Sequence, residues 1–186
     1  MKKYNYNFTK WFLHTKLGAF IGYKIGISGY NRIDITSVSP EGVRRVLRPS
    51  YNARVNVGAA LSASLLSGTT LGGISSPLPA KYIALSTSSL TPAMGNTTLT
   101  GETVATGLTR AAATMGTYVA PVSLDGAASY VASATFTNSS GSTVVILSSA
   151  IFDASSSGNM FVEANLNQTL TLANFATAIV NWTVNI

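Results

Sequence analysis

The fold is decided by residues 143–186, which begin with Thr143-Val-Val-Ile-Leu-Ser-Ser-Ala-Ile-Phe-Asp153 and close with Asn181-Trp-Thr-Val-Asn-Ile186. Three apolar runs lie within this stretch, separated by Ser, Gly and Asn residues, at 143–152, 159–166 and 176–186. Runs of this length that are rich in β-branched and aromatic residues are typical of antiparallel strands. The last run alternates polar and apolar side chains, and we therefore expect a sheet with Trp182 in its core.

Further strands are predicted upstream by the same criteria, at 32–38, 81–86 and 127–137, with 103–115 as one long strand or a pair of strands. On one face of the 127–137 strand we expect Tyr130, Ala132, Ala134 and Phe136. The total is about seven strands, at spacings typical of a β-sandwich or a jelly roll.

One helix is predicted over residues 53–67, because apolar residues recur there at helical spacing and Gly68 follows as a stop signal. Its apolar face would contain Val57, Ala60, Leu61, Ser64 and Leu65. Several Gly and Pro residues then predict a loop that reaches Pro79. We therefore expect a mainly β protein, an antiparallel and jelly-roll-like β-sandwich with one short helix.

Composition narrows the class of protein further. The chain has 186 residues, of which 46% are hydrophobic and only 10% charged, whereas an average soluble protein has roughly 25% charged residues. Such low charge suits extended β-structure and surfaces covered by neighbours, where a charge would lose its hydration without gaining a partner. The chain has no cysteine and a single histidine, which argues against thiolate and multi-histidine metal sites.

Positive charge is concentrated in the first 54 residues. They contain ten of the twelve Lys and Arg and two of the six acids, a net charge of +8, and the rest of the chain carries −2. This asymmetry predicts a basic arm attached to a nearly neutral body. We divide the chain into the arm at 1–54, a short helix with a Gly/Pro/Ser loop at 55–79, and a β-sandwich body at 80–186.

The arm supplies the candidate contact residues for nucleic acid or for another partner, which are Lys2, Lys3, Lys10, Lys16, Lys24, Arg44, Arg45, Arg48 and Arg54. The arginines are interpreted either as a solvated edge with ion pairs between subunits or as contacts to a nucleic-acid backbone, because guanidinium groups match phosphate oxygens. For residues 1–31, where aromatic and basic side chains interleave, the alternatives are an arm on a neighbouring protein, a contact to single-stranded nucleic acid, and a membrane-interface segment. The membrane alternative is not favoured, because no clean apolar face is seen.

No catalytic constellation is found in the sequence. The single histidine, His14, has no acidic residue close to it along the chain, as a hydrolytic triad would favour. Asp153 and Glu163 are interpreted as sheet-edge or ion-pair residues, and Glu102 with Arg110 as an ion pair across the sandwich. We expect no enzyme activity, no metal and no cofactor.

Five Asn-X-Ser/Thr triplets occur in the sequence. Chance explains most of them in a chain so rich in Asn, Ser and Thr. Asn96 and Asn138 lie in predicted turns, and we expect this pair to be accessible for glycosylation if the chain meets the machinery for it.

Several segments, read together, resemble a known family: Leu65-Leu-Ser-Gly68, Tyr82-Ile-Ala-Leu-Ser-Thr-Ser-Ser89, Thr97-Thr-Leu-Thr-Gly-Glu102, Ala150-Ile-Phe-Asp-Ala-Ser-Ser-Ser-Gly-Asn-Met-Phe-Val-Glu-Ala164 and Asn181-Trp-Thr-Val-Asn-Ile186. In this order they resemble small virion structural proteins of tailed phages and archaeal viruses. The resemblance covers roughly residues 55–186 and rests on no catalytic motif. Members commonly have an acidic or Gly-Asp turn before the last strand, where this chain has Leu172-Ala-Asn-Phe-Ala176.

The resemblance implies a β-sandwich used in tails, necks, vertices or capsid decoration. We therefore expect a homo-oligomeric virion component of a tail, neck or vertex, joined to other virion proteins through its basic arm. The alternatives are a receptor- or carbohydrate-binding module on a virion, a capsid decoration protein, and an independent nucleic-acid-binding protein.

Overall fold

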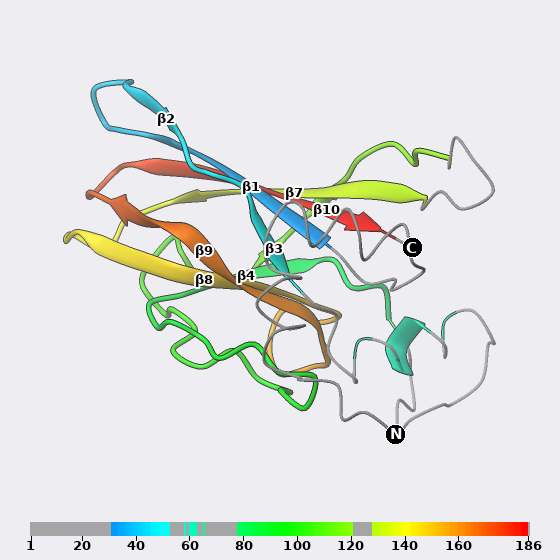
Figure 1. Ribbon diagram of the computed structural model, residues 1–186. Coiled ribbons are helices and arrows are strands. Elements are labelled where there is room, and N and C mark those ends of the chain that lie inside the picture. Colours follow the sequence, from blue (N-terminus) through cyan, green and yellow to red (C-terminus); the bar gives the residue numbers. More distant parts are fainter. Residues whose placement is uncertain are drawn as a thin grey trace, which may run out of the picture.

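Two antiparallel sheets make up most of the computed structural model, which describes residues 31–52, 58, 60–62, 65, 78–120 and 128–185 (Figure 1). The first sheet has the strand order β2-β1-β10-β7-β6, and β3 also pairs with β1. Its strands are β1 (Asn31–Val38), β2 (Arg44–Val46), β3 (Ser50–Asn52), β6 (Thr114–Met115), β7 (Ser129–Thr137) and β10 (Thr177–Asn185). The second sheet has the order β5-β4-β8-β9, with β4 (Tyr82–Ser86), β5 (Ala111–Ala112), β8 (Val144–Phe152) and β9 (Met160–Leu172).

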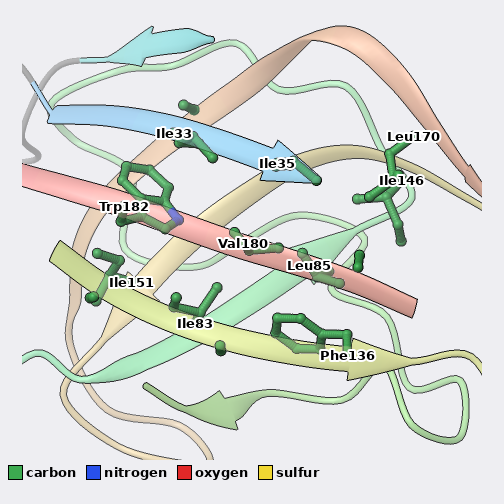
Figure 2. Packing of buried hydrophobic residues seen from close by; sticks show 14 of the residues in the cluster. Ile33, Ile35, Ile83, Leu85, Phe136, Ile146, Ile151, Leu170, Val180 and Trp182 are labelled. Carbon is green, nitrogen blue, oxygen red and sulfur yellow. The ribbon is translucent and has the colours of Figure 1, made fainter. Parts of the chain in front are cut away.

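The main core lies between the two sheets and is centred on Trp182 (Figure 2). On β10 the alternate residues Ala178, Val180, Trp182 and Val184 are all buried, as the sequence pattern predicts. A fully buried aromatic side chain of this size removes about 200 Å² from water, which stabilises the fold by at most about 5 kcal/mol. The expected core position of Trp182 is confirmed.

The indole N–H of Trp182 is satisfied inside this core. Its Nε1 donates to Ser149 Oγ at 3.2 Å, and the Ser149 hydroxyl donates to the carbonyl oxygen of Ala84 at 2.8 Å. Because Ser149 belongs to β8 and Trp182 to β10, this chain of two hydrogen bonds joins the two sheets through the core.

Among the four consecutive strands β7 to β10, the inner two pair with each other and the outer two pair with each other. β8 and β9 are neighbours in the second sheet, and β7 pairs with β10 in the first sheet. The connections from β7 to β8 and from β9 to β10 therefore pass from one sheet to the other. The predicted strands at 143–152, 159–166 and 176–186 are confirmed, and the middle one is longer than expected.

Two short segments close the sides of the sandwich. On one side the chain crosses from one sheet to the other within residues 111–115. There β5 forms the edge of the second sheet and β6, after Ala113, forms the edge of the first sheet. On the other side the chain near β3 lies against β9, where Asn167 N donates to Ser50 Oγ at 2.7 Å and Arg48 N donates to Gln168 Oε1 at 2.9 Å. Closure of this kind protects strand edges that could otherwise pair with another chain.

The predicted strand or strand pair at 103–115 is largely wrong. Only the two-residue strands β5 and β6 form there, and residues 103–110 run as an irregular segment without a named strand. The backbone makes a close approach at Gly107, which has a φ of +81° and where an added Cβ would lie 1.8 Å from the carbonyl oxygen of Thr137. This conformation favours glycine and cannot continue a strand.

The expected arm at 1–54 is also wrong where the structure describes it. β1 pairs with β10 along the whole of Arg32–Val38, and Ile33 and Ile35 are buried in the main core together with Leu47. Residues 31–52 therefore belong to the sandwich, and residues 1–30 lie outside the described residues. Among the described residues of this region, charge marks exposed side chains such as Arg44 and Arg45 and gives no sign of the buried apolar ones.

The predicted helix is confirmed at the residues that are described, because Gly58, residues 60–62 and Leu65 are helical. Leu61 is fully buried, but Leu65 is 44% exposed, so the expected apolar face is correct only in part. The helix packs closely on β9, since a Cβ at Gly58 would lie 1.9 Å from the carbonyl oxygen of Phe161.

We expect Ser149→Ala to lower the free energy of unfolding by about 1–3 kcal/mol, because it leaves the buried Trp182 N–H without an acceptor. Trp182→Phe made in the Ser149→Ala background should then cost less than the same change in the natural chain, because no N–H remains to be satisfied. Urea denaturation of the two single variants and the double variant measures this coupling. Thr135→Ala, at an exposed position of β7, serves as the control and should change stability by less than about 0.5 kcal/mol.

Candidate functional site

A tight turn connects β1 to β2 and holds the tip of this hairpin. Gly42 N donates to the carbonyl oxygen of Ser39 at 2.9 Å, Ser39 N donates to the carbonyl oxygen of Val43 at 2.9 Å, and Val43 N donates to Ser39 Oγ at 3.2 Å. Pro40 sets the backbone angle of the first turn residue, and Gly42 adopts the φ of +83° that the turn requires. The sequence therefore specifies a hairpin with a fixed tip.

The hairpin carries basic and apolar side chains that face solvent. Arg44, Arg45 and Arg48 are exposed, and Val43 and Val46 are 66% and 67% exposed. Within the described residues no ion pair involves these three arginines. Figure 1 shows the hairpin at one end of the sandwich, with its tip set apart from the strands below it. A two-stranded ribbon with both faces exposed and unpaired guanidinium groups is suited to contact a partner.

The hairpin is aligned with the two central strands of the first sheet. Arg44 lies opposite Val38 on β1, Val38 lies opposite Thr177 on β10, and Thr177 lies opposite Thr137 on β7. This row of four residues crosses the sheet at the end where the β9–β10 and β7–β8 turns are also found. Contacts made there would therefore involve both the hairpin and these turns.

Asn138 fixes the two turns to each other. Its Nδ2 donates to the carbonyl oxygens of Ser142, Leu172 and Ala173 at 2.7, 2.8 and 3.1 Å, and its Oδ1 accepts hydrogen bonds from Ser140. Asn138 is completely buried. The expected accessibility of Asn138 for glycosylation is therefore wrong, because the amide that would carry the glycan holds the turns together.

Phe175 projects from this arrangement in an unusual conformation. Its φ is +65° and its side chain is 68% exposed, while its backbone N donates to the carbonyl oxygen of Asn138 at 2.6 Å. A left-handed backbone costs a bulky residue about 1–2 kcal/mol, and the exposed ring recovers little of this cost through burial. We call these exposed residues the hairpin end: Val43, Arg44, Arg45 and Val46 on the hairpin, Arg48 just after β2, and Phe175 in the β9–β10 turn at the same end of the sheet.

The outer face of the second sheet is covered by the chain itself. The segment between β4 and β5 lies over this face (Figure 1) and forms a small second core with the outward side chains, made of Ala84, Leu99, Ala150, Phe152 and Met160. Asn165 fastens this segment, since its side chain accepts from Leu90 N at 2.6 Å and donates to Leu90 O at 2.7 Å. This explains why residues 160–164 of β9 are buried on both faces, which the sequence did not reveal.

Glu163 is a buried carboxyl group beneath the same segment. Its Oε1 accepts from Ala93 N at 3.1 Å and from Asn96 Nδ2 at 2.5 Å, while its Oε2 has no hydrogen-bond partner among the described residues. Burial raises the pKa of Glu163, and the two hydrogen bonds act in the opposite direction. The expected sheet-edge or ion-pair role is wrong, because Glu163 is 1% exposed and forms no ion pair with any residue that the structure describes.

The predicted ion pair between Glu102 and Arg110 is confirmed. Arg110 Nη2 lies 2.6 Å from Glu102 Oε2, and Arg110 Nε donates to Glu102 Oε1 at 2.9 Å. The guanidinium carbon is 3.6 Å from the centre of the Phe152 ring, which belongs to the second core. The pair therefore lies over the outer face of the second sheet and not across the main core.

The remaining predictions concern Asp153, Asn96 and six basic residues. The expected sheet-edge or ion-pair role is also wrong for Asp153, which is buried in the turn after β8 and forms no ion pair with a described residue; its carboxylate accepts from Asn159 N at 2.6 Å and from Asn159 Nδ2 at 2.7 Å. Asn96 is half-buried, and its Nδ2 also donates to Thr91 O at 3.2 Å, so a glycan on this nitrogen would displace its hydrogen bonds. Arg54 and the five expected lysine contacts lie outside the described residues, and these are Lys2, Lys3, Lys10, Lys16 and Lys24.

In the described part of the chain, no group of three or more acidic or histidine side chains is placed to hold a metal ion. Among the same residues, no helix has the length and hydropathy needed to cross a bilayer. Acids and bases in the described residues are engaged in structural contacts or stand alone on the surface. The described residues form two packed antiparallel sheets with exposed basic and apolar side chains at one end.

Comparison with known proteins gives the family. The model of the family described as "Podophage GP4 fiber I protein gp80" matches residues 56–182, which is more than half of the chain. The chain belongs to this family of phage fibre proteins, and it is a virion component. No curated protein matches the chain. The expected virion location and phage origin are confirmed, and the match covers nearly the same residues as the resemblance seen in the sequence.

Phe175→Asn should raise the free energy of unfolding by about 0.5–1 kcal/mol, because Asn tolerates the left-handed conformation better than Phe does. Phe175→Ala keeps a Cβ in the strained conformation, and its stability should stay within about 0.5 kcal/mol of the natural chain. Thermal and urea denaturation measure both variants. A clear loss of stability in Phe175→Asn would show that the ring supports the fold.

Glu163 should make stability fall as the pH rises. Its pKa in the folded protein lies above the ordinary value of 4.5, so the carboxyl group loses its proton at lower pH in the unfolded chain. The free energy of unfolding then decreases from about pH 4.5 up to the folded pKa, by about 1.4 kcal/mol for each pH unit between the two values. Denaturation between pH 4 and 8 should show that Glu163→Gln removes this decrease.

Glu41 is the matched control for this measurement. It is fully exposed, and its hydrogen bond with Ser39 lowers its pKa. Its contribution to stability is present above the unfolded pKa and is lost as the pH falls through the folded pKa. Glu41→Gln should therefore act in the opposite direction from Glu163→Gln, and equal pH profiles of the two variants would contradict the assignment to Glu163.

Proposed function

We propose that the protein is a non-catalytic structural component of a podophage fibre, which assembles as a homo-oligomer and joins neighbouring virion proteins through the hairpin end and residues 1–30. The observation that carries this proposal is the hairpin end itself, with three unpaired arginines and two exposed valines at a fixed position of a rigid sandwich. The family match supports a fibre, and a place at the tail, neck or vertex of the particle agrees with it.

We include a jelly-roll-like architecture in the proposal. It is supported by the nested pairing, in which β7 and β10 are paired outside the β8–β9 hairpin and the connecting turns pass between the sheets. Jelly rolls are double-sheet folds made of such Greek-key units. In a virion this kind of domain can stack through its faces and ends while its core stays unchanged.

A carbohydrate-binding module at a fibre tip is the alternative from another class. Such a site would need aromatic side chains that gather on one sheet face. Among the described residues, the exposed aromatics Phe175 and Tyr118 lie in the β9–β10 turn and in the segment after β6, and neither is on a strand. The structure therefore offers less support for sugar binding than for protein contacts.

The proposal predicts where the protein is found and how large it is in solution. Immunogold electron microscopy of intact particles should label a fibre, and light scattering of the purified chain should give a multiple of 19.4 kDa. A mass of one chain at micromolar concentration would contradict the oligomer. Particles that carry no label would contradict the structural role.

A further inference from the structure

We infer that the hairpin end binds an acidic protein surface with an apolar pocket, and that Phe175 inserts into this pocket. The partner is a different protein of the same virion and not a second copy of this chain. This inference rests on the proposed function and specifies the chemistry of the neighbour. Charge, side-chain exposure and backbone conformation each support one part of it.

Among the described residues, few carboxylates are free to supply the acidic charge that a second copy would need. Asp34 and Glu102 are already paired with arginines at 2.7 and 2.6 Å, and Asp153 and Glu163 are buried. Among the described carboxylates this leaves Glu41, which is exposed and belongs to the same turn as the arginines.

Two hairpin ends placed face to face would therefore bring six arginines together with two carboxylates. The excess of positive charge would repel, because like charges across an interface are unfavourable. A partner with several carboxylates would instead pair with Arg44, Arg45 and Arg48, whose guanidinium groups form bidentate contacts of this kind. Complementary charge thus points to a different and acidic chain.

The apolar residues of the hairpin end indicate a protein and not a nucleic acid. Val43 and Val46 are more than half exposed and lie on either side of Arg44 and Arg45. Aliphatic side chains gain little beside phosphates, whereas they are buried at the centre of protein interfaces with arginines around them. The surface therefore has the composition of a protein contact.

Phe175 has the properties of an anchor residue. Its ring is exposed, and its strained turn is held by the buried Asn138, so the side chain is presented from a rigid base. A rigid base lowers the entropy that is lost when the ring enters a pocket. A strained backbone that is held by surrounding contacts, at a residue whose side chain is mostly exposed, is typical of binding sites.

The test measures binding of the full chain to each of the other structural proteins of the particle, purified and immobilised one at a time, at 50 and 300 mM salt. One of them should bind, and binding should weaken at the higher salt. Arg44→Glu combined with Arg45→Glu should weaken it at least about tenfold, and so should Phe175→Asn. The Phe175→Asn variant should keep a melting temperature at least as high as that of the natural chain.

Lys81→Glu is the control, because Lys81 is an exposed cation that precedes β4 in the second sheet. It should leave the affinity unchanged. Unchanged binding by Phe175→Asn overturns the pocket, and binding of duplex or single-stranded DNA in place of any virion protein overturns the protein partner. A lower mass of the Arg44→Glu, Arg45→Glu variant in light scattering assigns the surface to a second copy. None of these results bears on where the protein lies in the particle, which the immunogold experiment tests separately.

Discussion

The structure depends on β10, which is hydrogen-bonded to β1 on one side and to β7 on the other. Its alternate residues fill the core, and Trp182 reaches the second sheet through Ser149. A shift of one residue in the pairing would turn Trp182 towards solvent, so the register is strongly determined. The position of the β1–β2 hairpin follows from this register, because β1 is held by β10, and so does the position of the turn that carries Phe175.

The outer face of the second sheet is covered by the chain, whereas the hairpin end of the first sheet is exposed. The second sheet is covered by the segment between β4 and β5, which is held by Glu163, Asn165 and the Glu102–Arg110 pair beside Phe152. At the hairpin end, the first sheet carries exposed valines and arginines instead. One face is thus covered by the chain itself, whereas basic and apolar side chains stay exposed at one end.

The sequence was informative where burial on one face imposes a period of two. β7 and β10 were predicted closely for this reason, and Trp182 was correctly placed in the core. It was less informative at 103–115, where side-chain contacts and Gly107 hold an irregular path. It was also less informative in β9, whose second buried face depends on a segment 70–75 residues earlier in the chain.

The candidate site shows the same limit. Arg44, Arg45 and Arg48 were found from their charge, but they were assigned to an arm, since charge alone does not reveal that Ile33, Ile35 and Leu47 are buried. Phe175 was noticed only as part of an unusual turn. The signal that could have identified it is a bulky aromatic residue between Asn and Ala in a turn that joins two long strands, but its left-handed backbone is visible only in the structure.

The pairing of β1 with β10 also has a consequence for synthesis. A ribosome makes β1 first and β10 after all the other strands, so the first sheet cannot close until both are available. Contacts between strands that are far apart in the sequence form slowly, whereas local hairpins form earlier. The β1–β2 hairpin is therefore synthesised long before the turn that contains Phe175. A nascent or truncated chain that lacks β10 cannot complete the first sheet, so β1 has no partner on that side until synthesis is nearly finished.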